Sequence, residues 1–471
     1  MPKNDYWKLS AYESAKLIKD GSISAEDLVS SCIERVNQTN NKINAIVDNL
    51  SEPALEKAHE LDKLTKKGKF KGPLHGVPIT IKENIDQKGY ATPNGLEALK
   101  DLIAPGNAPV VDNLEQDGAI VIGRTNTPEF SMRGTTDNVI HGRTYNPWND
   151  WASPGGSSGG ASAAVMSGMG SLAHGNDIAG SLRIPSTATG ACTVKPGLGR
   201  VPAFNPSQTQ ERGLVAQLMS VQGIIAREIK DVRLGMQSLI NYDPRDPWMV
   251  EMPFESKSVT SPIKIGYTKE TLGEVLHPAV DKALENAIEA LKDAGYILEE
   301  IVLPEFQDAT NYSARTLFGE LKALHEKDYK KLGSENFNSV ADNYFQIISP
   351  FEGEDLLLGM AKRSYFFREW NLFFRKYPLV LTPFLLYPTY EWDRDIQGLE
   401  GTKEVLAGIF YAHTMNYLGI PAGVVSANYN DGLPVGVQII SSRFCEDIIL
   451  KACEEIEKRV GIMAEKLFAR G

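Results

Sequence analysis

Basic residues are in deficit in this sequence. Lys and Arg number 49 against 60 Asp and Glu in 471 residues, so the formal net charge is −11. Because a nucleic-acid-binding surface needs a basic excess to neutralise phosphates, the composition disfavours nucleic acid as a partner. Cysteine is also scarce, and Cys32, Cys192, Cys445 and Cys453 show no close metal-binding spacing. This usage is typical of a reducing compartment and predicts a cytoplasmic protein without a metal site.

Long apolar runs are missing as well. No uncharged apolar segment approaches the roughly 20 residues that a helix needs to cross a bilayer. The opening residues, MPKNDYWK, lack the apolar core of a signal peptide. With 42% hydrophobic and 23% charged residues, the chain is nevertheless too apolar to be disordered. We therefore expect a large core and no membrane partner.

Segments with helical and strand-like patterns alternate along most of the chain, which favours an α/β layered fold. Residues 1–70 are predicted to form an N-terminal helical part. The strand-like segments are 77–82, 119–123, 263–267, 296–301, 379–381 and 435–440, and the later helical ones are 108–116, 227–241, 278–294 and 446–459. No repeat, low-complexity linker or long charge block divides the chain, so residues 1–471 are predicted to be a single domain.

Aromatic residues gather between positions 306 and 377. These 72 residues hold 15 of the 40 aromatics of the chain. One interpretation is a helical layer that packs its rings into the core. The other is a cap over a pocket, in which some rings face an apolar or aryl substrate. Both can hold for different residues of the segment.

A glycine-rich loop at 155–160 precedes an alanine-rich helical pattern. Such a loop presents free backbone N–H groups at a helix N-terminus and can hold an anion or a developing oxyanion. It lacks the Lys-Ser/Thr of a phosphate-binding P-loop. Residues 155–159 satisfy G-x-S-x-G, the pattern of a nucleophile elbow, but the preceding residues read as a loop rather than the required strand. His413, the histidine that this alternative would use, has helical neighbours typical of a core or pocket-wall position.

A second turn of small residues, 176–183, contains Ser181. A serine after such a turn can combine its hydroxyl with converging backbone N–H groups, as acyl transfer requires. Lys82, at the end of an apolar strand, is the candidate base, because burial lowers the pKa of a lysine and a neutral lysine accepts a proton. Taken alone, Lys82 also fits a strand-end lysine whose amine reaches solvent.

Several motifs together resemble the amidase signature family of Ser–Ser–Lys hydrolases. Residues 72–84, GPLHGVPITIKEN, resemble the segment around the catalytic lysine of that family, and 155–160 and 177–185 resemble the two halves of its signature. Further matching segments are 195–202, 221–227, 419–422 and 431–438. The resemblance extends from about residue 10 to 460.

The resemblance implies one large α/β/α domain, with a mixed central sheet flanked by helices, that hydrolyses a C–N bond without a cofactor. By position, Ser181 is the acylated nucleophile, and Ser157, in a cis-peptide conformation, relays a proton to a neutral Lys82. The implied oxyanion hole uses backbone N–H groups of Ile178, Ala179, Gly180 and Ser181, and the implied supporting residues are Ser158, Asp177 and Arg183.

The sequence departs from the family pattern at three positions. Ala179 stands where a glycine is usual, Asn176 where a threonine precedes the aspartate, and Glu83 where an aspartate is usual. We expect ordinary backbone at Ala179, with its methyl group narrowing the acyl pocket. Neighbours along a strand point to opposite faces, so Glu83 is not expected to pair with Lys82.

The predicted substrate is a small amide, aryl amide or carbamate, with esters as further candidates, and family members are often homodimers. The alternative within the family is the A subunit of the glutamine-dependent amidotransferase that corrects misacylated transfer RNA. That subunit commonly has glutamine after the signature arginine, where this chain has Ile184. The remaining alternatives are a His413-dependent serine esterase and a catalytically silent binding protein.

Overall fold

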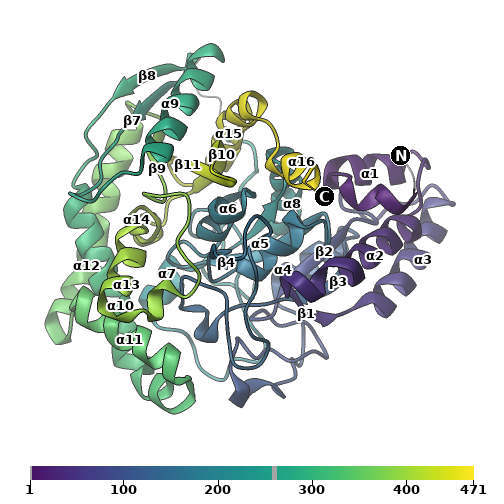
Figure 1. The fold of residues 1–471 in the computed structure, drawn as a ribbon, viewed down its shortest axis with the longest axis horizontal. Helices are drawn as coiled ribbons and strands as arrows, with labels where there is room; N and C mark the ends of the chain where they lie inside the picture. Colours follow the sequence, from purple (N-terminus) through teal and green to yellow (C-terminus); the bar gives the residue numbers. More distant parts are fainter. Residues whose placement is uncertain (1–2, 257–261, 471) are drawn as a thin grey trace.

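One mixed sheet crosses the molecule from side to side (Figure 1). The computed structural model describes residues 3–256 and 262–470, and within them the sheet has 11 strands in the order β1-β3-β2-β4-β6-β5-β10-β11-β9-β7-β8. Their bounds are β1 Ile46–Asn49, β2 Pro78–Lys82, β3 Ile120–Thr125, β4 Leu172–Asp177, β5 Cys192–Lys195, β6 Val221–Ala226, β7 Lys264–Tyr267, β8 Ile297–Glu300, β9 Leu379–Pro383, β10 Ala422–Asn430 and β11 Leu433–Ser441.

Helices cover both faces of this sheet. The α-helices are α1 Ala11–Lys19, α2 Ala25–Ile43, α3 Ser51–Thr65, α4 Pro109–Gln116, α5 Gly159–Met166, α6 Arg183–Thr189, α7 Leu214–Met219, α8 Ile229–Leu239, α9 Pro278–Asp293, α10 Phe306–Leu332, α11 Glu335–Ile348, α12 Gly353–Phe374, α13 Gly398–Ala407, α14 Phe410–Leu418, α15 Glu446–Val460 and α16 Met463–Phe468. Short 3-10 helices span Lys3–Lys8, Glu97–Leu99, Glu129–Ser131 and Arg394–Ile396.

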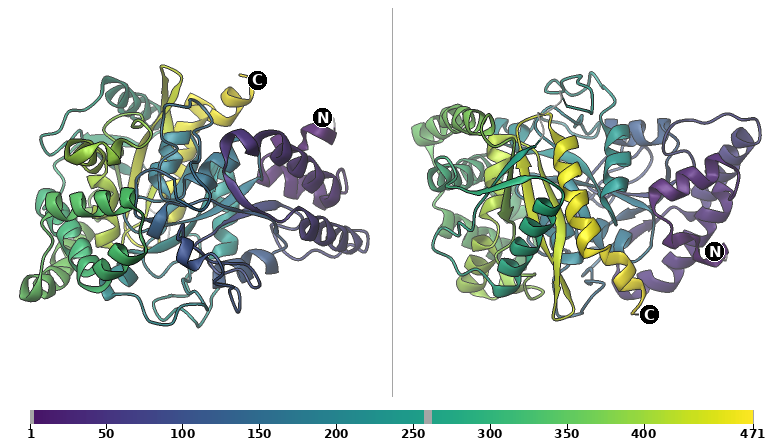
Figure 2. Two further views of the ribbon diagram at one scale, coloured as in Figure 1. Left: turned by 60° about the horizontal axis from the view of Figure 1, so that its bottom comes forward. Right: turned by 90° about the horizontal axis from the view of Figure 1, so that it is seen from above.

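The two layers follow from side-chain alternation along the strands. Val425 of β10 packs in one hydrophobic cluster with residues of α8, α9 and α15, whereas the preceding Val424 packs in another with residues of α10, α12 and α14. Because successive side chains of a strand point to opposite faces, these clusters are the cores on the two sides of the sheet. The chain termini meet at one side, where Trp7 packs edge-on against Phe468, with ring centroids 4.8 Å apart (Figures 1 and 2).

The predicted single α/β domain with a mixed sheet flanked by helices is confirmed. Each strand or helix predicted from residue 77 onward lies within two residues of its predicted ends. The purely helical interpretation of residues 1–70 is wrong in one place, because β1 interrupts it and pairs antiparallel with β3 at the sheet edge. Strands β4, β5, β6 and β10 were not predicted as strands, since their glycine, asparagine and cysteine content hides the apolar pattern.

Three helices, α10, α11 and α12, account for most of residues 306–377 and form a layer at one end of the molecule (Figure 2). Four of their rings, those of Phe306, Phe366, Trp370 and Phe374, are buried in one core cluster. Phe318 and Tyr344 instead line a cavity. The core interpretation therefore holds for the first four rings, and the cap interpretation stays a prediction for the residues that line the cavity. No helix in the described part of the chain is long and apolar enough to cross a membrane.

Candidate active site

Lys82 is the last residue of β2 and lies between β3 and β4 in the interior of the sheet. Its side chain is fully buried, so the alternative of an amine that reaches solvent is excluded. The Nζ atom lies 2.7 Å from Ser157 Oγ, 3.2 Å from Ser158 Oγ and 2.8 Å from Asn176 Oδ1. Three polar side chains, two from the glycine-rich loop and one from β4, therefore converge on one buried amine.

Burial lowers the pKa of Lys82 to about 7, against the opposing effect of the Asp177 and Glu83 carboxylates. As predicted, Glu83 turns away from Lys82. Its Oε1 accepts a hydrogen bond from Gly95 N at 3.0 Å, and its Oε2 lies 2.9 Å from His141 Nε2. A large fraction of Lys82 is consequently neutral near pH 7, as a proton acceptor must be.

The glycine-rich loop brings Ser157 to Lys82. The Gly156–Ser157 peptide bond is cis, as the resemblance implied. Glycine is required at 156, because a Cβ there would lie 2.4 Å from the carbonyl oxygen of Arg133. Ser158 N donates to Ser181 O at 3.3 Å, which ties this loop to the second one. No strand precedes the loop, so the required context of a nucleophile elbow is missing.

The second loop begins where β4 ends, at Asp177, and carries Ser181 just before α6. Asp177 accepts hydrogen bonds from Gly180 N at 2.7 Å and Leu182 N at 3.2 Å, so its carboxylate shapes the turn. Arg183 donates to both carboxylate oxygens of Asp177 at 3.0 and 3.1 Å. This pairing, together with backbone hydrogen bonding, holds the pKa of Asp177 below its usual value despite burial.

Arg183 also anchors the turn to the far part of the chain. Its guanidinium donates to Gln438 Oε1 at 2.8 Å, Asn416 Oδ1 at 2.6 Å and the Ala412 carbonyl at 2.9 Å. A fully buried guanidinium with several acceptors is a rigid support, because each lost contact would leave a buried donor unpaired. The geometry is that expected of a supporting residue.

Not all of the four predicted oxyanion-hole N–H groups are free in the turn. Gly180 N–H is already donated to Asp177, which leaves Ile178, Ala179 and Ser181 of the four predicted oxyanion donors. Gly180 has φ +114°, and a Cβ there would lie 2.7 Å from both Ala412 Cβ and Ile184 Cδ1. The backbone of Ala179 lies outside the left-handed region, as expected, and Ala179 lines a cavity.

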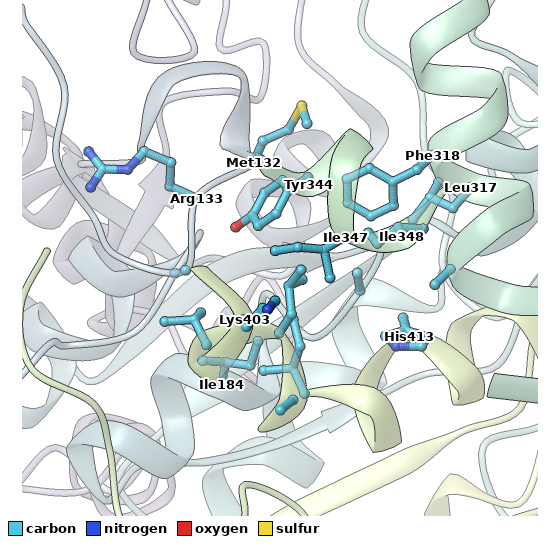
Figure 3. A pocket seen from close by; sticks show the side chains of 18 of the residues that line it. Met132, Arg133, Ile184, Leu317, Phe318, Tyr344, Ile347, Ile348, Lys403 and His413 are labelled. Carbon is cyan, nitrogen blue, oxygen red and sulfur yellow. The ribbon is translucent and has the colours of Figure 1, made fainter. Parts of the chain in front are cut away.

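Two cavities meet at Ser181. The larger, about 790 Å³, is walled mainly by apolar side chains of α10, α11 and the segment around α14, among them Leu317, Phe318, Ile347, Ile348 and Ile409 (Figure 3). The smaller, about 360 Å³, contains Ser157, Ser181 and Asn176 together with Asn84 and Asn205. Ser181 thus stands between the larger cavity and a smaller one that contains polar residues close to Lys82.

His413 lines the larger cavity, as the pocket-wall interpretation predicted. Its Nδ1 lies 3.0 Å from Ser313 Oγ, so a serine rather than a carboxylate orients the ring. Burial, with the nearby Arg183 charge, lowers the pKa of His413 to about 4. A histidine without an orienting carboxylate and with so low a pKa is a poor general base, which disfavours the esterase alternative.

Two contributors to the site were not singled out from the sequence as functional. Asn176 Oδ1 accepts from Lys82, and its Nδ2 donates to Asn84 Oδ1 at 3.0 Å. Asn84 Nδ2 in turn donates to Ser131 Oγ at 3.0 Å. The departure from the threonine of the family pattern at position 176 was the sequence signal that could have pointed to Asn176, because its longer side chain reaches Lys82.

Comparison with known proteins agrees with this arrangement. The Amidase family profile matches residues 27–450. The chain is 42% identical to indoleacetamide hydrolase of Bradyrhizobium diazoefficiens, over 99% of this chain and 89% of that protein. It is 33% identical to acylamidase of Rhodococcus erythropolis, over 97% of this chain and 96% of that protein.

Among solved structures, a bacterial aryl acylamidase of the amidase signature family superposes with a TM-score of 0.82 at 26% identity, covering 98% of each chain. The A subunit of glutamyl-tRNA(Gln) amidotransferase from Moorella thermoacetica is more distant, at 28% identity over 96% of this chain and 97% of that protein. This chain therefore belongs to the amidase signature family and is an amide hydrolase.

Proposed function

We propose that Ser181 is the nucleophile, that Ser157 relays its proton, and that Lys82 is the base. The observation that carries this proposal is the 2.7 Å contact of Ser157 Oγ with a buried lysine whose pKa is lowered to about 7. Ser157 and Ser181 also border the same small cavity, where a scissile bond can reach both hydroxyl groups. Acyl transfer through a serine requires this combination of nucleophile and base.

The contacts of Lys82 account for the direction of its lone pair. A neutral amine has two N–H donors and one lone pair. Asn176 Oδ1 can only accept, and Ser158 Oγ accepts while its own proton points to Asn176 O at 3.4 Å. With both N–H groups so occupied, the lone pair is left for Ser157 Oγ–H. We infer that Asn176 is a positioning residue that aims the base.

The reaction then proceeds in two stages. Ser181 Oγ attacks the amide carbon, its proton passes to Ser157 Oγ, and the Ser157 proton passes to Lys82 Nζ. Lys82 returns a proton through Ser157 to the departing nitrogen as the C–N bond breaks, leaving an ester on Ser181. Water hydrolyses this acyl-enzyme by the same relay. Backbone N–H groups of Ile178, Ala179 and Ser181 stabilise the oxyanion in both stages.

The substrate proposed is an aryl acetamide of the size of indole-3-acetamide. The apolar cavity of about 790 Å³ lies within the range that encloses small ligands, and its wall includes Phe318 and Tyr344. The 42% identity to an indoleacetamide hydrolase supports the same acyl group. In this proposal residues 306–377 form the cap that shapes the pocket, and the polar chamber beside Ser157 receives the ammonia.

Hydrolysis by the purified chain alone tests this function. Indole-3-acetamide should yield equal amounts of indole-3-acetate and ammonia, which chromatography and an ammonia assay measure. Its kcat/KM should be higher than that of acetanilide, an aryl carbamate or a p-nitrophenyl ester. The apolar pocket predicts no ammonia from glutamine, which serves as the control. The amidotransferase alternative would be established instead if glutamine were the one substrate that releases ammonia, and if it did so only after partner subunits are added.

A further inference from the structure

His413 places a polar atom on the wall of the larger cavity. The residue lies on α14, one position after Ala412, whose methyl group approaches Gly180 of the Ser181 turn. Figure 3 shows its ring facing the space that Phe318 and Ile347 border from the other side. The edge of the ring that carries Nε2 is therefore available to whatever occupies the larger cavity.

The contacts of Ser313 determine which ring nitrogen carries the proton. Ser313 Oγ lies 2.8 Å from the His413 carbonyl oxygen and 3.0 Å from His413 Nδ1. The carbonyl can only accept, so the single hydroxyl proton of Ser313 points to it, and Ser313 Oγ must accept from Nδ1–H. A neutral imidazole protonated on Nδ1 has a lone pair on Nε2.

Neutrality of the ring follows from its surroundings. Burial and the Arg183 charge lower the pKa of His413 to about 4, so the imidazole carries no charge near pH 7. Nε2 is consequently an acceptor. No residue within 3–256 or 262–470 donates a hydrogen bond to it.

Most other polar groups on this wall already have partners in the protein. Thr310 Oγ1 bonds Thr414 Oγ1 at 2.9 Å, and the Tyr390 hydroxyl donates to the Gly134 carbonyl. The Tyr344 hydroxyl also faces the cavity, but a phenol can donate or accept and so does not discriminate. His413 Nε2, by contrast, has a fixed hydrogen-bonding sense, that of an acceptor.

We propose that His413 Nε2 accepts a hydrogen bond from an N–H or O–H donor on the ring of the substrate, and that this contact selects donor-bearing aryl amides over isosteres without the donor. The inference rests on the proposed function, since it assumes that the ring occupies the larger cavity. An indole N–H is such a donor. A polar atom on the wall of a binding pocket discriminates because a ligand without the matching group leaves that atom unpaired.

Paired isosteric substrates test the proposal. Indole-3-acetamide and benzofuran-3-acetamide differ by N–H against O, and the wild type should favour the indole by about 10-fold in kcat/KM, the size of one neutral hydrogen bond. His413→Leu should bring this ratio close to 1 while retaining benzofuran-3-acetamide hydrolysis, which also reports correct folding. His413→Gln, which keeps an acceptor, should restore part of the preference.

Binding to Ser181→Ala protein separates this inference from the proposed function. Calorimetry should show that indole-3-acetamide binds more tightly than benzofuran-3-acetamide, whether or not the wild type hydrolyses either amide. This comparison also tests the role of His413 if the His413→Leu protein does not fold. The role of His413 would be overturned if the two amides bound equally, if the benzofuran amide bound more tightly, or if neither bound. It would also be overturned if a folded His413→Leu protein kept the wild-type ratio of kcat/KM for the two amides. Failure of hydrolysis with preserved indole preference would overturn only the proposed function.

Discussion

Ser181→Ala should lower kcat on indole-3-acetamide by about 10⁴-fold or more, since it removes the atom that forms the acyl-enzyme, and loss of a serine nucleophile elsewhere costs about 10⁶-fold. Lys82→Met should cause a loss of similar order, because members of one proton relay act as a unit. Steady-state ammonia release with each purified variant measures both effects. A burst of acylated protein in the wild type, detected by intact mass, should be missing in Ser181→Ala.

Matched controls isolate chemistry from folding. Ser186 is a fully buried serine of α6 whose Oγ donates to the Leu182 carbonyl, so Ser186→Ala makes the same substitution five residues away and should keep most of the activity. Lys195→Met removes another fully buried lysine, whose Nζ donates to the Pro196 carbonyl at 2.8 Å. If Lys82→Met retained turnover near that of Lys195→Met, the lysine base would be wrong.

Asn176→Asp should move the acidic limb of the pH–rate profile upward by roughly 1–3 pH units. In the wild type, Lys82 must be neutral to accept a proton, and its pKa is about 7, so kcat/KM should rise with pH through about 7. A carboxylate in place of the amide that lies 2.8 Å from Nζ stabilises the ammonium form and raises that pKa. At pH 7 the variant should therefore lose about 10- to 1000-fold in kcat/KM, and much of the loss should be recovered at high pH.

Two variants make the pH experiment decisive. Burial also lowers the pKa of Lys195 to about 7, so Lys195→Met tests whether that lysine contributes to the acidic limb, and we expect the limb to stay in place. Asn176→Thr, which brings no charge, should lower kcat without moving the limb to higher pH. An unshifted profile in a folded, active Asn176→Asp protein would contradict both the lysine base and the positioning role of Asn176.

Much of the fold was predictable because its signals are local. The β-branched residues at 79–81 of β2 and 120–122 of β3 form a local strand signal, and both strands are buried along their whole length. Strands such as β4 and β5 were not predictable in this way. β4 carries His174 and Asn176, which contact Gln222 and Lys82 in other strands, so tertiary pairing overrides a weak local preference.

The amino-acid sequence by itself determined the layered α/β class, the small-residue loops and the Lys82 and Ser181 candidates, and the resemblance to the amidase signature family implied the role of Ser157. These features depend on residue type and short spacing, which backbone freedom and side-chain size translate directly into structure. Only the tertiary structure decided that Asn176 meets Lys82 across 94 residues, that Gly180 N–H is taken by Asp177, and that Ser313 orients His413 across 100 residues. Hydrogen bonds of this kind depend on atom positions after the sheet has assembled, and residue spacing along the chain carries no information about them.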